Sequence, residues 1–452
     1  MTRPEGARVA LASLAVAALL AAGPAGANET LAPAWVGKLQ ADLRALALRD
    51  ASPRGPRAPR FGAYVRDLAS GADVSWKADE RWYWASMVKL PVAIAVLRGV
   101  ERGEWTLETQ VTVRPGDYVD GAGPTSSLPV GAPASVRWLL EQMMGLSDNT
   151  ASDMLIDLVG LADVNATLQA LVPEGSANAI TTLADVRRAI WNRVAPGAGD
   201  RLKGRDLLAL RALPSDADRL QHVARLADLP PARLRAGALD RAYDAYFESG
   251  VNSGRLDAYG AMLKALDDGR ALGPAMTRTL LALMERATTG AHRVKAGLPP
   301  GTRFAHKTGT QRRRVCDAGI VRWTAGAATA GATPAPSTTS TTFTMPDAAR
   351  EKHVLIVACT RDEPSLERAE STLAQIGLAI CRSGLFQSGP PANEPSRGPL
   401  ADATTAVSSR VAVAGCPTLA LAERTAALDD EGRPVAPTAA PPLPRGVGGS
   451  GR

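Results

Sequence analysis

Ser86 and Lys89 are the first residues whose types and spacing suggest a reaction. They lie in Trp84-Ala85-Ser86-Met87-Val88-Lys89-Leu90, a stretch that continues as an apolar run to Leu97 and is predicted to be a buried helix opened by Ser86. Residues three apart share one face of a helix, so the lysine amine can reach the serine hydroxyl and accept its proton. About 0.4 Ser-x-x-Lys matches are expected by chance, and a capping serine beside an unrelated lysine is the alternative. The pair alone therefore assigns no function.

Two further triplets follow along the chain. They are Ser147-Asp148-Asn149 and Lys307-Thr308-Gly309, the second of which continues into Thr310. Chance predicts about 0.02 matches for the first and about 0.05 for the second, so the ordered set of three has a probability below about one in a thousand. The first lies between two predicted helices and the second on a predicted strand. The three motifs therefore indicate one site.

The ordered set of Ser-x-x-Lys, Ser-Asp-Asn and Lys-Thr-Gly resembles that of class A β-lactamases and penicillin-binding proteins. The likeness runs from about Phe61 to Gly384. It implies an α+β fold of the β-lactamase/transpeptidase-like type, in which a five-stranded antiparallel sheet flanked by helices packs against an all-helical domain. It also implies a serine hydrolase that opens β-lactam amides through an acyl-Ser86 intermediate.

The resemblance implies a role for each motif residue. Ser86 is the expected nucleophile, and Lys89 is the nearest base. Ser147 is the expected proton donor, and Lys307 the source of positive potential. The residues expected to bind the substrate are Asn149, Thr308, Gly309 and Thr310. The backbone N–H groups of Ser86 and Thr310 would form the oxyanion hole. Asp148 is expected to hold its loop in place.

The chain departs from the class A pattern at the step that removes the acyl group. The Glu-x-x-Leu-Asn motif is absent, and Asp185 is the only acid in the corresponding stretch 179–187. Asp185 is therefore the candidate base for deacylation, but its side chain is one methylene shorter than glutamate, so we predict slow deacylation, with a burst before weak steady release. Ala318 and Gly319 stand where the family often has an arginine opposite the Lys-Thr-Gly strand. Two alternatives stay open: a D-alanyl-D-alanine carboxypeptidase or peptidase acting on cell-wall peptides, and a penicillin-binding protein without turnover.

The N-terminus has the layout of a secretory signal peptide. Arg3 and Arg8 precede an apolar run from Val9 to Ala22, and Ala25-Gly26-Ala27 provides small residues for cleavage after Ala27. No later stretch is apolar over the 18 residues that a membrane span needs. We therefore predict a secreted or periplasmic protein, without a membrane span after cleavage and monomeric.

The domain organisation is predicted to be discontinuous. Residues 28–85 and 270–387 would form the sheet domain, with a low-complexity insertion at 325–346, and residues 86–269 the helical domain. Extra helices fill about 193–247, and residues 388–452 are predicted to be disordered. The predicted helices and strands outside the motifs are helices 34–49, 183–194, 204–213, 217–226, 239–247, 255–267, 274–286 and 365–383, hairpin strands 61–68 and 72–76, and strands 302–310, 315–323 and 354–360. Ser135 is predicted to cap a helix, and Thr150 to Asp153 to form a capping box.

Charge and cysteine content limit the partners. The net charge of +7 is spread along the chain except for Arg312-Arg313-Arg314, which is predicted to be a solvated turn, and no nucleic-acid module accompanies it. The four histidines show no ligand-like spacing, so neither a metal nor a cofactor is expected, and the expected partner is a small β-lactam or a cell-wall peptide. Three disulfide pairings remain possible for the four cysteines, which are Cys316, Cys359, Cys381 and Cys416. Alternatively, Cys316 and Cys359 are small core residues.

Overall fold

The computed structural model describes residues 32–49, 60–228, 230, 237–324, 351–387 and 415–419. The predicted signal peptide, the low-complexity insertion at 325–346 and most of the predicted tail lie outside these residues. The predicted domain boundaries stay a prediction.

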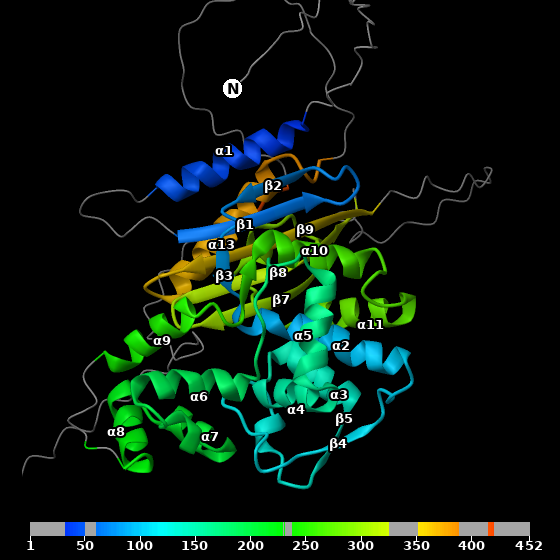
Figure 1. Ribbon diagram of the computed structural model, residues 1–452. Helices are drawn as coiled ribbons and strands as arrows, with labels where there is room; N and C mark the ends of the chain where they lie inside the picture. The colour runs from blue at the N-terminus through cyan, green and yellow to red at the C-terminus, as the bar shows by residue number, and fades with distance from the viewer. Residues whose placement is uncertain are drawn as a thin grey trace, which may run out of the picture. The chain divides into compact units, whose positions relative to one another are not determined.

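A five-stranded antiparallel sheet runs through the centre of the fold (Figure 1). The order of its strands is β2-β1-β9-β8-β7, so the hairpin of the first two strands joins the last three through the pairing of β1 with β9. The bounds are Arg60–Asp67 for β1, Asp73–Trp76 for β2, Arg303–Gln311 for β7, Arg314–Trp323 for β8 and Lys352–Arg361 for β9. The predicted hairpin and the three predicted late strands are therefore confirmed, and the α+β fold is as expected.

The two faces of the sheet bury alternate side chains, as the period of a strand requires. On β9, Ile356 faces the side covered by α1 (Ala34–Leu48) and α13 (Leu366–Arg382), whereas Val357 faces the larger helical side. The predicted apolar stripe of α1 is confirmed, because its four buried residues are Trp35, Leu39, Leu43 and Leu46. A short helix, α12 (Val294–Gly297), and α13 also lie close together on this side.

Helix α2 (Lys89–Glu101) forms the middle of the helical side. Every residue from Lys89 to Leu97 is buried, so this helix is covered on all sides rather than along one stripe. The helices around it and towards the sheet are α3 (Val136–Glu141), α4 (Asn149–Val159), α5 (Leu161–Leu171), α10 (Leu256–Asp267) and α11 (Pro274–Glu285). Short strands pair at β3 (Arg81–Tyr83) with β6 (Ser253–Arg255) and at β4 (Gln110–Thr112) with β5 (Pro133–Ser135).

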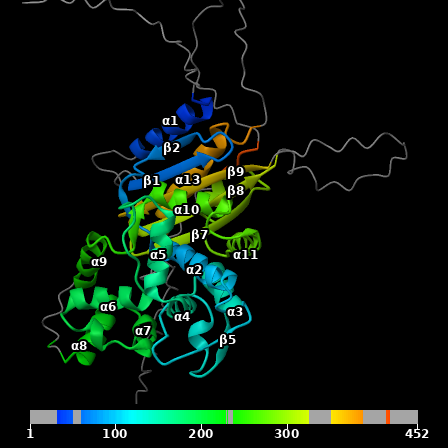
Figure 2. The ribbon, with the colours of Figure 1, turned by 45° about the vertical axis from the view of Figure 1, so that its right-hand side comes forward.

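Four helices of the middle region gather at one end of the molecule in both ribbon views (Figures 1 and 2). They are α6 (Leu183–Val194), α7 (Gly204–Ala212), α8 (Asp216–Leu226) and α9 (Ala238–Glu248). Each lies within one residue of its predicted bounds, and the apolar period is strong in α6, α8 and α9 but weak in α7. We call α7, α8 and α9 the inserted helices.

Both disulfides join segments that are far apart in the sequence. Cys316 on β8 is bonded to Cys359 on β9, and Cys381 on α13 to Cys416. The first disulfide links directly opposed residues of neighbouring strands, which decides between the two readings left open for that pair. Within the described residues, no single helix is long and apolar enough to cross a membrane, and only the pair α4 and α5, bent by 91°, passes that test together.

Candidate active site

Ser86 lies on a 3-10 turn, Ala85–Val88 (η1), that leads directly into α2. The sequence predicted that Ser86 would open the α-helix itself, but α2 begins three residues later, at Lys89. Side chains three apart eclipse one another on a 3-10 turn, so Ser86 and Lys89 still share a face. Ala85 has a φ of 48°, an uncommon value for a residue with a side chain, and its place beside Ser86 suggests strain at a functional turn.

Lys89 is completely buried and bonded to the second motif. Its Nζ donates to the Ser147 carbonyl at 2.6 Å, to the Ser147 hydroxyl at 3.1 Å and to Asn149 Oδ1 at 2.7 Å. Burying an amine is costly unless hydrogen bonds compensate, and these acceptors provide them. The first two motifs, 58 residues or more apart, are therefore held together through one amine.

Ser147 joins all three motifs. It ends a π-helical turn, Gln142–Leu146 (η3), in the left-handed conformation with φ 63° and ψ 35°. Its hydroxyl oxygen accepts from Lys307 Nζ at 2.9 Å as well as from Lys89. With both lone pairs engaged, the hydroxyl can direct its own proton only away from the lysines. Ser147 is thus arranged to donate a proton to a bound molecule.

Asp148 fixes the loop, as predicted. One carboxylate oxygen caps α4 by accepting the N–H of Ala151 at 2.9 Å, and the other accepts the N–H of Thr125 at 3.0 Å. The predicted capping box from Thr150 to Asp153 is wrong, because the N-cap of α4 is Asp148 and the box residues lie inside the helix. The Asp148 carboxylate, rather than the Thr150 hydroxyl, therefore accepts a free N–H group of the first turn of α4.

Strand β7 carries the third motif along the cavity. Thr308 is buried, and its hydroxyl lies 2.7 Å from that of Thr289 in the loop after α11. A Cβ atom at Gly309 would lie 2.4 Å from the carbonyl oxygen of Trp84, two residues before Ser86. Only glycine therefore allows β7 to lie this close to the turn that holds Ser86.

Arg293 is a site residue that the sequence did not reveal. It is buried, and it donates to Thr310 Oγ1 at 2.7 Å, to the Gly309 carbonyl at 3.1 Å and to Glu370 Oε1 at 3.1 Å. Arg293 thus brings a guanidinium to the Lys-Thr-Gly strand from a different segment, whereas Ala318 and Gly319 on β8 carry no charge. A single arginine in an aperiodic loop has no sequence pattern that would mark it as a site residue. The preceding Thr288-Thr289-Gly290 indicates only a turn.

These residues enclose a cavity of about 200 Å³. The residues that line it are Ser86, Ala122, Leu146, Ser147, Thr289, Gly290, Arg293, Thr308, Thr310, Leu366 and Glu370. A nucleophilic hydroxyl, a second hydroxyl between two lysines and a buried guanidinium thus meet in one space. That arrangement can bind an anionic molecule and transfer an acyl group to serine.

Asp185 lies elsewhere. It is the third residue of α6, its side chain is about half exposed, and its carboxylate pairs with Arg188 at 3.0 Å. It is not among the residues that line the cavity at Ser86. The structure therefore brings the other predicted site residues together but does not bring Asp185 to them.

Asp153 is a buried carboxylate one turn after Asn149 on α4. Its two oxygens accept the N–H groups of Leu183 and Ala184, in the first turn of α6, at 2.7 and 2.8 Å. Burial raises the pKa of Asp153 to about 7, although these two bonds and the nearby charge of Lys89 oppose the rise. Asp153 thus connects the helix of the second motif to α6.

The titration of Asp153 should be visible in stability. Because folding raises this pKa from 3.8, the folded chain binds the proton more tightly, and the resulting stability is fully present below pH 3.8 and is lost as the pH rises to 7. At about 1.4 kcal/mol per pKa unit, the loss is about 4 kcal/mol. Urea unfolding should show that the free energy of unfolding of Asp153→Asn depends less on pH between 4 and 7 than that of the unchanged protein. Equal slopes for the two proteins would contradict this assignment.

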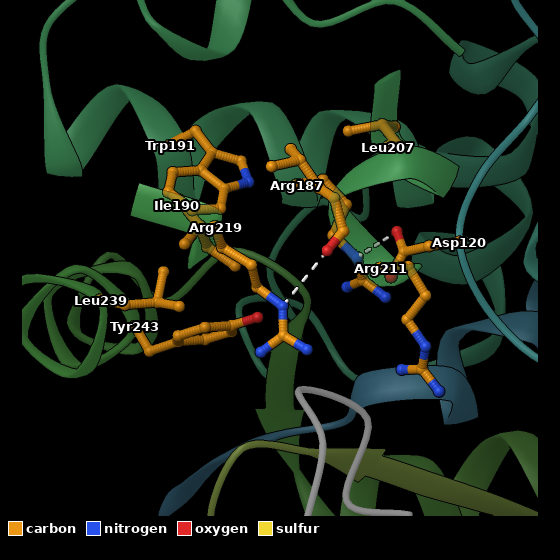
Figure 3. Close-up of a pocket in the computed structure, with 10 residues that line it drawn as sticks. Asp120, Arg187, Ile190, Trp191, Leu207, Arg211, Arg219, Leu239 and Tyr243 are labelled. Carbon is orange, nitrogen blue, oxygen red and sulfur yellow. Dashed lines mark hydrogen bonds and ion pairs between the residues drawn. The ribbon is translucent and has the colours of Figure 1, made fainter. Parts of the chain in front are cut away.

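A second, smaller cavity of about 20 Å³ lies between α6 and the inserted helices (Figure 3). Arg187 on α6 pairs there with Asp120 at 2.8 Å, and both side chains are buried. The carbonyl of Asp120 accepts the side-chain N–H of Asn149 at 2.6 Å. Asp120 therefore links the wall of this cavity to Asn149 of the second motif.

The fold and the site together define a serine-hydrolase-like protein of the β-lactamase/transpeptidase-like type. The chain belongs to the Beta-lactamase enzyme family, whose family profile matches residues 38–341, more than half of the chain. A β-lactamase of Streptomyces fradiae is 35% identical over 34% of this chain, and the chain spans only about half (49%) of that relative's length. A β-lactamase of Streptomyces albus G is 28% identical over 65% of this chain and 75% of its own. The crystal structure of a β-lactamase from Sphaerobacter thermophilus has a similar fold, with a TM-score of 0.51 and 23% identity over 78% of this chain and 99% of its own.

Proposed function

We propose that this protein reacts with β-lactams through an acyl-Ser86 intermediate and releases the product slowly. The observation that carries the proposal is the position of the Ser147 hydroxyl, which accepts hydrogen bonds from Lys89 and Lys307 and lines the same cavity as Ser86. The three motifs thereby meet around one space with the donors and acceptors that acyl transfer requires.

Acylation begins when Ser86 Oγ attacks the lactam carbonyl carbon. Once the Lys89 ammonium has released one proton to solvent, and with it one of its three donated hydrogen bonds, its amine accepts the Ser86 proton, and the N–H groups of Ser86 and Thr310 stabilise the oxyanion. When the C–N bond breaks, the leaving nitrogen takes a proton from the Ser147 hydroxyl. Ser147 is replenished from the ammonium of Lys89, which lies 3.1 Å away, so the proton count balances.

The substrate carboxylate would bind at the far end of the cavity. Thr308 offers its hydroxyl there, Arg293 supplies a buried positive charge, and Lys307 adds a second one. Glu370 pairs with Arg293 and reduces the net positive charge, which limits binding to a single carboxylate rather than a dianion. An anionic β-lactam or the C-terminus of a peptide would fit these groups.

Slow deacylation follows from where the acids lie. Among the described residues that line the cavity, Glu370 is the only acid, and its carboxylate is bonded to Arg293. Both oxygens of Asp148 and of Asp153 accept backbone N–H groups. None of these carboxylates is placed to activate a water for attack on acyl-Ser86, so the acyl group should persist.

The decisive experiment is labelling with a fluorescent penicillin, followed by mass spectrometry of the labelled peptide. We expect one adduct per chain, on Ser86, and no label on Ser86→Ala. A chromogenic cephalosporin should give a burst of about one equivalent followed by weak steady release, and Asp185→Asn should leave that steady rate unchanged. Label on Ser86→Ala would refute the acyl-serine proposal, and steady hydrolysis without a burst would refute slow release.

A peptidase acting on cell-wall peptides is the second candidate. The hydroxyl of Thr308 and the charges of Arg293 and Lys307 suit a C-terminal peptide carboxylate as well as that of a β-lactam. Release of D-alanine from a pentapeptide stem would support this activity. A protein that is labelled by penicillin but inert towards such peptides would restrict the function to β-lactams.

We also propose that the protein acts outside the cytoplasm. The Cys316–Cys359 and Cys381–Cys416 disulfides support this proposal, because disulfides persist in oxidising compartments. The signal peptide predicted over residues 1–27 would direct the export. N-terminal sequencing of protein recovered from the producing cells should begin at Asn28, and recovery of the full-length chain from the cytoplasm would oppose this proposal.

A further inference from the structure

Three arginines line the second cavity, and each comes from a different helix. Arg187 lies on α6, Arg211 in the last turn of α7 and Arg219 on α8 (Figure 3). The lining residues include one acid, Asp120, whose carboxylate pairs with Arg187 at 2.8 Å. Three positively charged side chains and one negatively charged side chain therefore meet at this cavity.

Arg219 is a buried cation whose donors are only partly used, since 8% of its surface is exposed. Its Nη1 donates to Asp216 at 2.9 Å, and its Nε and Nη2 donate to the carbonyls of Leu210 and Leu213 at 3.3 and 2.9 Å. These bonds use three of the five N–H groups of a guanidinium. Within the described residues, the other two N–H groups of Arg219 have no partner, so the cavity that this side chain lines offers them a place for an acceptor.

Asp216, the acid that pairs with Arg219, is shared with a second arginine. Arg312, in the turn between β7 and β8, donates to Asp216 at 2.6 Å and to Asp240 on α9 at 2.7 Å. All three arginines of this turn form ion pairs, so the prediction of a solvated turn for 312–314 is wrong. Although burial raises it, the pKa of Asp216 lies below its ordinary value because two guanidinium groups are close. One carboxylate thus faces two cations and cannot neutralise both.

The size and the walls of the cavity limit the kind of anion that fits. Its volume is about 20 Å³, and one water-sized particle needs about 10–15 Å³. A halide ion is slightly larger than water and fits, whereas a phosphate, a sulfate or an organic acid is too large. The other lining residues are apolar or aromatic, and they are Ile190, Trp191, Leu207, Leu210, Leu239 and Tyr243. Attraction between opposite charges is stronger between such walls than in water.

We propose that the second cavity is a binding site for a single chloride ion, held by the guanidinium groups of Arg187, Arg211 and Arg219. Bound chloride accepts hydrogen bonds from these groups, reduces their mutual repulsion and joins α6, α7 and α8 around one centre. Because the unfolded chain has no such site, the free energy of chloride binding stabilises the folded protein. The site is separate from the chemistry at Ser86 and does not depend on the proposed acylation.

Thermal unfolding of the full chain measures this stabilisation. Sodium chloride and sodium gluconate are compared at equal concentration, so that the screening of surface ion pairs is the same in both salts. We expect chloride to raise the midpoint of unfolding by about 2–4 °C relative to gluconate, with the saturation that binding at one site requires. Bromide should replace chloride, because it has the same charge and nearly the same size. Equal midpoints in chloride and gluconate would overturn the proposal.

Arg211→Gln and Arg205→Gln form a matched pair of variants on α7. Arg211 lines the cavity, whereas the Arg205 guanidinium lies 4.5 Å from the ring centre of Tyr118 and is not among the lining residues. We expect Arg211→Gln to lose at least about half of the chloride-dependent shift, because one of three cations is removed, and Arg205→Gln to keep all of it. A shift that survives in Arg211→Gln, or that falls equally in both variants, would show that chloride acts elsewhere.

Crystals of the unchanged protein soaked in sodium bromide locate the ion without any variant, because bromide scatters X-rays anomalously. We expect an anomalous peak in the cavity, within hydrogen-bonding distance of the Arg219 guanidinium. Peaks confined to the protein surface would assign the cavity to water and overturn the proposal, even if chloride raises the midpoint of unfolding. Penicillin labelling of Ser86 is a separate measurement, so its failure would refute the proposed function and leave the chloride site unaffected.

Discussion

Replacing Lys89 by methionine should slow acylation of Ser86 by about 100- to 10,000-fold, the usual contribution of a positioned general base. Methionine has a similar length and is apolar, so the packing around this fully buried side chain should be kept. The variant leaves the Ser147 carbonyl and Asn149 Oδ1 without the N–H donors that Lys89 gives them at 2.6 and 2.7 Å. Stopped-flow measurement of penicillin acylation under single-turnover conditions gives the rate directly.

Two controls separate chemistry from folding in that experiment. Loss of the donors should cost about 1–3 kcal/mol of stability per orphaned acceptor, so circular dichroism must show a folded variant at the assay temperature. Lys264→Met removes an exposed lysine that pairs with Asp268 on α10 and should leave acylation unchanged. If folded Lys89→Met acylates less than about 100-fold more slowly than the unchanged protein, another group accepts the Ser86 proton.

Replacing Arg293 by methionine should lower the free energy of unfolding by about 3–5 kcal/mol, because it leaves Glu370 as a mostly buried carboxylate without its cation. The carbonyl oxygens of Gly309 and Cys316 would also lose their bonds to Arg293, at 3.1 and 2.9 Å. Urea unfolding measures this loss. The affinity for anionic β-lactams should fall as well, since a buried positive charge at the carboxylate end is removed.

Glu370→Gln provides the matched test of the cause. If the unpaired carboxylate dominates, the combined Arg293→Met and Glu370→Gln protein should be more stable than Arg293→Met alone, which a double-mutant cycle measures. The combined protein should still bind anionic β-lactams weakly, because the guanidinium remains absent. An additive cycle would contradict the importance of the ion pair.

Local patterns in the sequence predicted most of the secondary structure and most of the site. The stripe of α1, the hairpin of β1 and β2 and the four helices from α6 to α9 follow from apolar periods that one segment carries by itself. The three motifs were recognisable because the residues of each lie within one short stretch of the sequence and have their own chemistry. Their order along the chain also predicted the five-stranded α+β fold through the resemblance to known serine hydrolases.

Only the tertiary structure decided the features that depend on partners distant in the sequence. The arginine run at 312–314 looks like a solvated turn until α8 and α9 bring three acids to it. Arg293 enters the site through the Thr310 hydroxyl, and Asp185 turns away from it towards Arg188. A local pattern records which faces are apolar, but not which charged side chains become buried together, because that depends on the packing of whole elements and on the cost of leaving a buried charge unpaired.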